Sequence, residues 1–254
     1  MDRLIKQGLS AQLLAWGDDE FILGHRDSEW CGHAPILEED IAFANIALDE
    51  LGHAQTWYTL LAQLLDEDAD RYPDRLVYRR PAAEFRNVQM VEFPNGDWAF
   101  SMLRQYLFDQ METIRLEMLR NSRYPALSEA AVKLGKEEIY HRRHTRAWVE
   151  RLSGGTQESH RRTQNALGTL WPAAMQLFNP IQGEVELSEA GIIPTSHELK
   201  SAWLDETENF LKSSGLQIPE SRQNEFDRQE HSLSLNPLIA ELQSVNRLDL
   251  EAEW

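Results

Sequence analysis

The chain has only one cysteine, Cys31, among its 254 residues. A single thiol excludes any disulfide within the chain, so a packed core alone has to stabilise the fold. This composition is typical of proteins from a reducing compartment, and we expect a cytoplasmic location. Because Cys31 has no basic neighbour except His33, we expect it to pack rather than to react.

The sequence also lacks a long apolar run and is poor in positive charge. No apolar stretch approaches the roughly 20 residues that a membrane-spanning helix needs, and the first ten residues, MDRLIKQGLS, are too polar for a signal peptide. Lys and Arg number 25 against 42 Asp and Glu, which gives a formal net charge of −17. This acidity argues against nucleic acid or an anionic membrane as a partner.

Alternation of apolar and polar residues with a period of two, which marks half-buried strands, is almost absent. Apolar residues instead recur at helical spacing and predict an all-α fold with a four-helix core at 2–24, 36–65, 97–121 and 126–152. Further helices are expected at 157–178 (with a bend at Pro172), 196–213 and 236–248, and a loop at 214–234. The connection 66–96, which closes with the turn sequence PNG, is long enough to cross the end of a bundle.

Two Glu-x-x-His pairs lie in the middle of predicted helices, Glu50 with His53 and Glu138 with His141. A residue and its i+3 neighbour face the same side of a helix, and both pairs lie on a stripe that is otherwise apolar. Burying these groups is costly without a partner, and a metal ion is the obvious one. With eight histidines in the chain, about one such pair is expected by chance, so the spacing alone is also compatible with surface Glu–His contacts.

The placement of two further carboxylates favours the metal. Glu20 and Asp109 each lie on the inward stripe of the preceding helix, at nearly equal distances in sequence before Glu50 and Glu138. Bundles that hold two iron or manganese ions take one carboxylate from each of two helices and a Glu-x-x-His from each of the others. Oxygen donors with two imidazoles suit iron or manganese better than zinc. The candidate metal ligands are Glu20, Glu50, His53, Asp109, Glu138 and His141.

Three neighbouring carboxylates compete with members of this set, namely Asp19, Glu112 and Glu137. Asp109 is one methylene shorter than the usual Glu, and Glu112 lies one turn later. Glu137 reaches His141 at i+4. The sequence also does not decide what the site holds. Two iron ions, manganese, or a metal-free cluster of carboxylates that share protons would all suit these residues.

Short strings along the chain match the pattern of a known family. They include EWCGHAP at 29–35, PNG at 94–96, RQY at 104–106, ERL at 150–152 and the terminal Trp254. The similarity extends over nearly the whole chain, and EWCGHAP is its most specific string. The sequence thereby resembles the C-subunit family of bacterial phenylacetyl-CoA epoxidase, also called ring 1,2-phenylacetyl-CoA oxygenase.

The resemblance implies a single ferritin-like helical domain over residues 1–254, with a core bundle at about 2–152 and additional C-terminal helices at about 157–248. It also implies a role in the multicomponent oxygenase that epoxidises the aromatic ring of phenylacetyl-CoA in aerobic phenylacetate breakdown. In that system the di-iron centre lies in a related A subunit, and a reductase passes on electrons from a nicotinamide cofactor. The C subunit is usually described as having lost metal ligands, whereas this chain keeps ligand-type residues at all six positions.

The leading interpretation is therefore a structural partner of the di-iron catalytic A subunit, with a metal site that is still assembled. It predicts a heteromeric assembly or a homodimer. The second interpretation is an independently catalytic di-iron oxygenase. A third, an iron- or manganese-binding protein of the ferritin group, is disfavoured by the long chain and by EWCGHAP. No catalytic residue is assigned.

Overall fold

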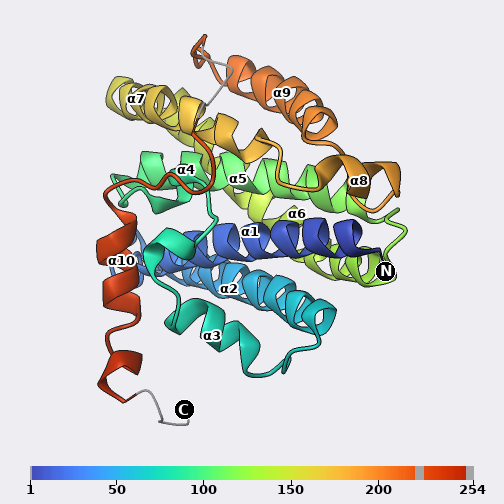
Figure 1. Cartoon of the computed structure of the whole chain (residues 1–254). Helices are drawn as coiled ribbons and strands as arrows, with labels where there is room; N and C mark the ends of the chain where they lie inside the picture. The colour runs from blue at the N-terminus through green and yellow to red at the C-terminus, as the bar shows by residue number, and fades with distance from the viewer. Residues whose placement is uncertain (1, 221–225, 250–254) are drawn as a thin grey trace.

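The computed structural model describes residues 2–220 and 226–249. Regular structure in this part of the chain is helical throughout, without a strand (Figure 1). None of the helices in these two ranges is long and apolar enough to cross a membrane. The all-α fold expected from the helical spacing of apolar residues is confirmed.

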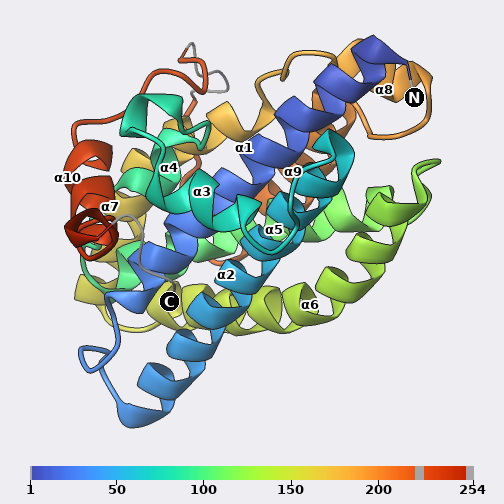
Figure 2. The same ribbon diagram turned by 60° about the horizontal axis from the view of Figure 1, so that its bottom comes forward.

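Four long helices form the core bundle: α1 (Arg3–Ser28), α2 (Leu37–Leu65), α5 (Trp98–Leu119) and α6 (Pro125–Gly154). α1 packs along α2 and α5 along α6, so that two helix hairpins lie against each other (Figures 1 and 2). α2 also contacts α6 across the bundle. These are the four helices that the sequence predicts, with ends displaced by up to four residues, and the ferritin-like bundle is confirmed.

Local chemistry explains where these helices begin. The side chains of Asp2 and Asp97 accept hydrogen bonds from the amides of Leu4 and Phe100 and so cap α1 and α5. α6 begins at Pro125, whose missing N–H is harmless in the first turn. In α2 the first turn carries three acidic residues, which the positive end of the helix dipole favours.

The connection between α2 and α5 contains more structure than the sequence indicated. It forms α3 (Tyr72–Tyr78), the 3-10 turn Ala82–Glu84 and α4 (Gln89–Glu92). Buried Asp18 on α1 holds it by accepting hydrogen bonds from the Arg80 guanidinium and the Arg86 amide. Elements of seven residues or fewer are too short to show helical periodicity, which is why the sequence predicted only a long connection.

The chain after α6 forms further helical elements: α7 (Gln157–Ala174), the 3-10 turn Met175–Phe178, α8 (Glu184–Glu189) and α9 (Ser196–Ser213). α8 packs on α1. α7 and α9 pack on the side of α5 away from α2 (Figure 1). α7 continues past Pro172 and changes to a 3-10 turn after Ala174. The expected helix at 236–248 is interrupted and forms α10 (Leu235–Leu242) and a 3-10 turn at Asn246–Leu248.

Two expectations about single residues have different outcomes. Cys31 is exposed and does not pack, because it lies in the turn between α1 and α2 rather than on a helix face. The terminal Trp254, which contributed to the family resemblance, lies outside the described residues.

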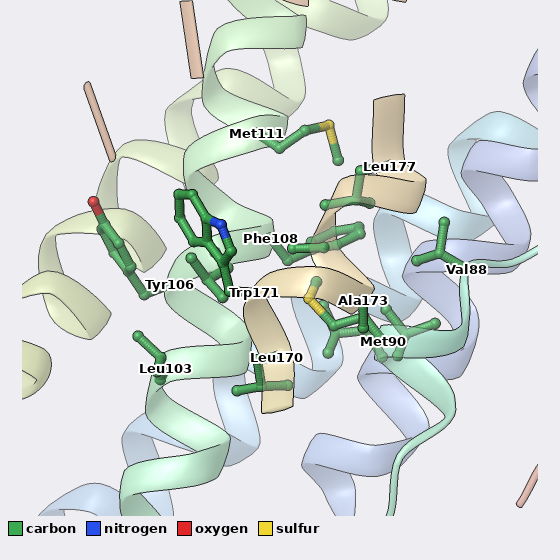
Figure 3. Close-up of a cluster of buried hydrophobic side chains, with 14 of the residues drawn as sticks. Val88, Met90, Leu103, Tyr106, Phe108, Met111, Leu170, Trp171, Ala173 and Leu177 are labelled. Atoms are coloured by element: carbon green, nitrogen blue, oxygen red, sulfur yellow. The ribbon is translucent and has the colours of Figure 1, made fainter. Parts of the chain in front are cut away.

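The largest hydrophobic cluster joins the core bundle to the added helices. Phe108 and Met111 of α5 pack with Leu170 and Trp171 of α7 (Figure 3). Trp203 of α9 lies 5.1 Å from Trp171, measured between ring centroids, and donates a hydrogen bond to a backbone carbonyl of α5. The C-terminal helices therefore share one core with the bundle, and they leave the opposite side of α5 to face α1, α2 and α6.

Close packing of α1 on α2 yields a first prediction. A Cβ at Gly24 would lie 2.9 Å from Cβ of Glu50 and 3.0 Å from the carbonyl oxygen of Ala47. We expect Gly24→Ala to lower the free energy of unfolding by about 1–3 kcal/mol through overpacking. Exposed Gly52 has no atom within 4 Å of such a Cβ, and Gly52→Ala should raise that free energy by about 0.5–1 kcal/mol. Urea denaturation measures both, and equal effects would contradict this close approach.

Candidate metal centre

All six candidate ligands converge in the middle of the bundle, and each has 0% exposure. One comes from α1, one from α5, and two each from α2 and α6. Ligand atoms of Glu20, Glu50 and His53 lie within 4.8 Å of one another, and so do those of Glu50, Glu138 and His141. The centre therefore consists of two triads that share Glu50. We call them the His53 triad and the His141 triad.

Both histidines point Nδ1 toward the centre. His53 Nδ1 lies 3.4 Å from Glu138 Oε1 and 3.9 Å from Glu20 Oε2. His141 Nδ1 lies 3.3 Å from the same Glu138 oxygen and 3.6 Å from Glu50 Oε1. The two imidazole rings are stacked, with centroids 5.9 Å apart. Glu138 thus lies between the two rings.

The outer nitrogens of the two histidines are held crosswise between α2 and α6. His53 Nε2 is 2.9 Å from Oε2 of Glu137, and His141 Nε2 is 3.1 Å from Oδ2 of Asp49. With the proton on Nε2, each ring donates outward and presents a lone pair at Nδ1, as in metal-binding histidines with a carboxylate partner. The side chains of Asp49 and Glu137 are 38% and 42% exposed, so they lie between the histidines and solvent.

This arrangement gives Glu137 a different role from that of a competing ligand. It binds the outer face of His53, while Glu138 faces the centre. Asp49 is not among the carboxylates that helical spacing predicts for the centre, although the sequence carries a signal for it. In both helices an acidic residue directly precedes the Glu of the pair, which gives the pattern acid-Glu-x-x-His.

Asp109 reaches the centre but has both oxygens occupied by neutral donors. Gln105 Nε2 donates to Oδ1 at 2.7 Å, and the Thr145 hydroxyl donates to Oδ2 at 2.8 Å. The same Gln105 amide donates to Glu50 Oε1 at 2.6 Å. Asp109 is a member of neither triad, and its role as a ligand stays a prediction.

The two other rival carboxylates are each bound by an arginine. Asp19 accepts hydrogen bonds from the backbone N–H of Val88, in the connection between α2 and α5, and from Arg228, in the segment between α9 and α10. Glu112 is fully buried and pairs with Arg115, one turn later on α5. Arg115 also lies 3.4 Å from Glu20 Oε1.

Burial dominates the electrostatics of the centre. It raises the pKa of Glu20 well above its ordinary value, and the neighbouring Glu50 raises it further. Burial likewise raises the pKa of Glu50 to about 7. For His141, burial lowers the pKa, but contacts with Asp49, Glu138 and Glu50 outweigh it and the net shift is upward. Without a metal the cluster therefore holds protons, which a metal ion would have to displace.

Several polar atoms of the triads lack a hydrogen-bond partner, and a metal ion could bind them. Six of them are buried and have no hydrogen-bond partner among the described residues: Glu20 Oε2, Glu50 Oε2, Glu138 Oε1 and Oε2, His53 Nδ1 and His141 Nδ1. A buried polar atom without a partner costs about 1–3 kcal/mol. Carboxylate oxygens and imidazole nitrogens suit iron or manganese. The donor set and the unmet hydrogen bonds both point to a divalent ion of this kind.

A second prediction concerns the outer partner of His141. Asp49→Asn should weaken binding of Mn²⁺ by about 10- to 100-fold, because a neutral amide holds the Nε2 proton of His141 less strongly. Titration of chelator-treated protein with Mn²⁺ measures the affinity. Glu129→Gln, at an exposed carboxylate of α6, serves as the matched control and should leave the affinity unchanged. Equal affinities in the two variants would argue against this role of Asp49.

Comparison with known proteins agrees with the resemblance seen in the sequence. A family model described as "Phenylacetic acid catabolic protein" matches residues 1–254. The chain is 36% identical over 248 residues to the C subunit of 1,2-phenylacetyl-CoA epoxidase from Escherichia coli (strain K12), which covers 97% of this chain and 99% of the relative. The A subunit of the same epoxidase is 23% identical over 199 residues, 76% of this chain and 63% of that protein. The chain belongs to the phenylacetic acid catabolic protein family.

Proposed function

We propose that this chain is the structural C-type subunit of a phenylacetyl-CoA epoxidase and holds the related catalytic A subunit in a working assembly in the cytoplasm. The observation that carries the proposal is the match to the C subunit of the Escherichia coli epoxidase over nearly the full length of both chains. The match to the A subunit is weaker and covers only part of that protein. The role lies in the aerobic breakdown of phenylacetate.

The second interpretation, an independently catalytic oxygenase, has the weaker support in sequence. The A subunit is 23% identical over 63% of its own length, whereas the C subunit is 36% identical over 99% of its length. The comparison therefore favours the C-type role.

We also propose that the centre binds divalent iron or manganese. The residues that would hold it are Glu20, Glu50, His53, Asp109, Glu138 and His141. A pair of such ions supplies reductive activation of O₂ in the catalytic members of these bundles. In this chain, Asp49 and Glu137 would accept a hydrogen bond from Nε2 of each histidine when Nδ1 binds a metal, and the triad residues are fully buried.

Assembly with the catalytic partner is the direct test of the structural role. Mixed with a purified A-subunit homologue, this chain should co-sediment with it and change its epoxidase activity in the presence of the reductase, while showing no activity alone. Glu50→Leu, compared with the native chain in the absence of metal, is the matched control, because a purely structural role does not need the centre and this variant should then assemble equally well. A chain that stays monomeric and ignores the A-subunit homologue would overturn the proposal.

Metal binding is tested by thermal unfolding. An ion that binds the folded bundle stabilises it by about 2.7 kcal/mol at a hundred times its Kd, which corresponds to roughly 5–10 °C in melting temperature. Removal of metal should therefore lower the melting temperature, and Glu50→Ala or Glu138→Ala should abolish that dependence. In metal-free protein, Glu50→Leu should be neutral or stabilising, since apolar packing replaces a costly buried carboxylate. A melting temperature indifferent to Fe²⁺ and Mn²⁺ would contradict metal binding.

A further inference from the structure

A buried guanidinium lies inside the carboxylate cluster. The Arg115 side chain is 3% exposed, and one of its terminal nitrogens contacts both Glu112 and Glu20, two carboxylates with no exposure. Its guanidinium also lies over the ring of Trp16, 4.7 Å from the centroid. Arg115 is therefore held in place by two ion pairs and an aromatic face.

This arginine makes the two triads unequal in charge. It contacts Glu20, which belongs to the His53 triad only. In the described ranges, no Lys or Arg forms an ion pair with Glu50 or Glu138, and nearby Asp109 is held by the neutral donors Gln105 and Thr145. The His53 triad therefore has an arginine of its own, whereas the cation of the His141 triad is its imidazole, which gives up its proton when it binds a metal.

A divalent ion meets different costs at the two triads. At the His53 triad it would approach Arg115, and like charges repel strongly where water is excluded. Moving the guanidinium away would leave Glu112 as a buried, unpaired charge, which is strongly unfavourable. The His141 triad has no guanidinium to displace. Buried atoms without a hydrogen-bond partner occur in both triads, among them both oxygens of Glu138 and Nδ1 of His141, so the arginine is what separates the two costs.

We propose that the centre binds a single divalent ion at Glu50, Glu138 and His141, and that Arg115 supplies the positive charge that a second ion would provide. The inference rests on the proposed metal binding and narrows it to one ion. Arg115 is then the positioning residue that decides how many ions the bundle accepts. A centre with one ion lacks the metal pair of the catalytic members of such bundles.

The two histidines provide a matched pair of variants, because each is fully buried and each has one outer carboxylate partner. Chelator-treated protein is titrated with Mn²⁺, and bound metal is followed by elemental analysis and electron paramagnetic resonance. The native chain should bind one Mn²⁺ with the signal of a magnetically isolated ion. His53→Leu should keep that ion, whereas His141→Leu should lose affinity by about 100-fold or more, since it removes a direct ligand.

Arg115→Met tests the role of the guanidinium directly. It should allow a second Mn²⁺ to bind, with the signal of a magnetically coupled pair. The inference would be overturned if the native chain bound two ions or none, or if both histidine variants lost affinity equally. A single ion in Arg115→Met would show that Arg115 does not limit the number of ions. If Arg115→Met does not fold, the histidine pair decides. Assembly with the A-subunit homologue is measured separately and without metal, so its failure is distinguishable from failure of the one-ion site.

Discussion

Two crossed contacts, His53 with Glu137 and His141 with Asp49, join the two helix hairpins of the bundle and orient its centre. Each runs between α2 and α6, which share far less contact with each other than each does with its own hairpin partner. Because the outer nitrogens are fixed, both Nδ1 atoms face the same carboxylate, Glu138. The geometry of the triads, and any metal chemistry there, depends on this pair of contacts.

The neighbouring acidic residues of α1 show how one helix serves three parts of the fold. Asp18 binds Arg80 of the connection, Asp19 binds Arg228 of the C-terminal segment, and Glu20 faces the centre. All three carboxylates are fully buried. Successive residues on a helix point about 100° apart. Asp18 and Asp19 can therefore bind the connection and the segment around Arg228, while Glu20 points into the centre.

The sequence predicted the long helices and the convergence of six polar residues, because both follow from helical periodicity. It preferred Glu20 to Asp19 but kept Asp19 as a rival, because the partners that bind Asp19, Val88 and Arg228, lie far away in the chain. The short helices of the connection were missed for lack of periodicity. The contact of Arg115 with Glu20 was also beyond the sequence, because it pairs residues of different hairpins, and only the packing of α1 against α5 brings them together.

Partial exposure of Asp49 and Glu137 has a thermodynamic consequence. In water, these carboxylates hold their histidines through hydrogen bonds that solvent weakens. A protein surface that covered them would remove that solvent and strengthen both bonds, because electrostatic interactions grow as the local dielectric falls. The affinity of the centre for a metal would then rise when the partner protein binds. By reciprocity, a chain that holds a metal would bind that partner more tightly. The centre would thereby respond to assembly.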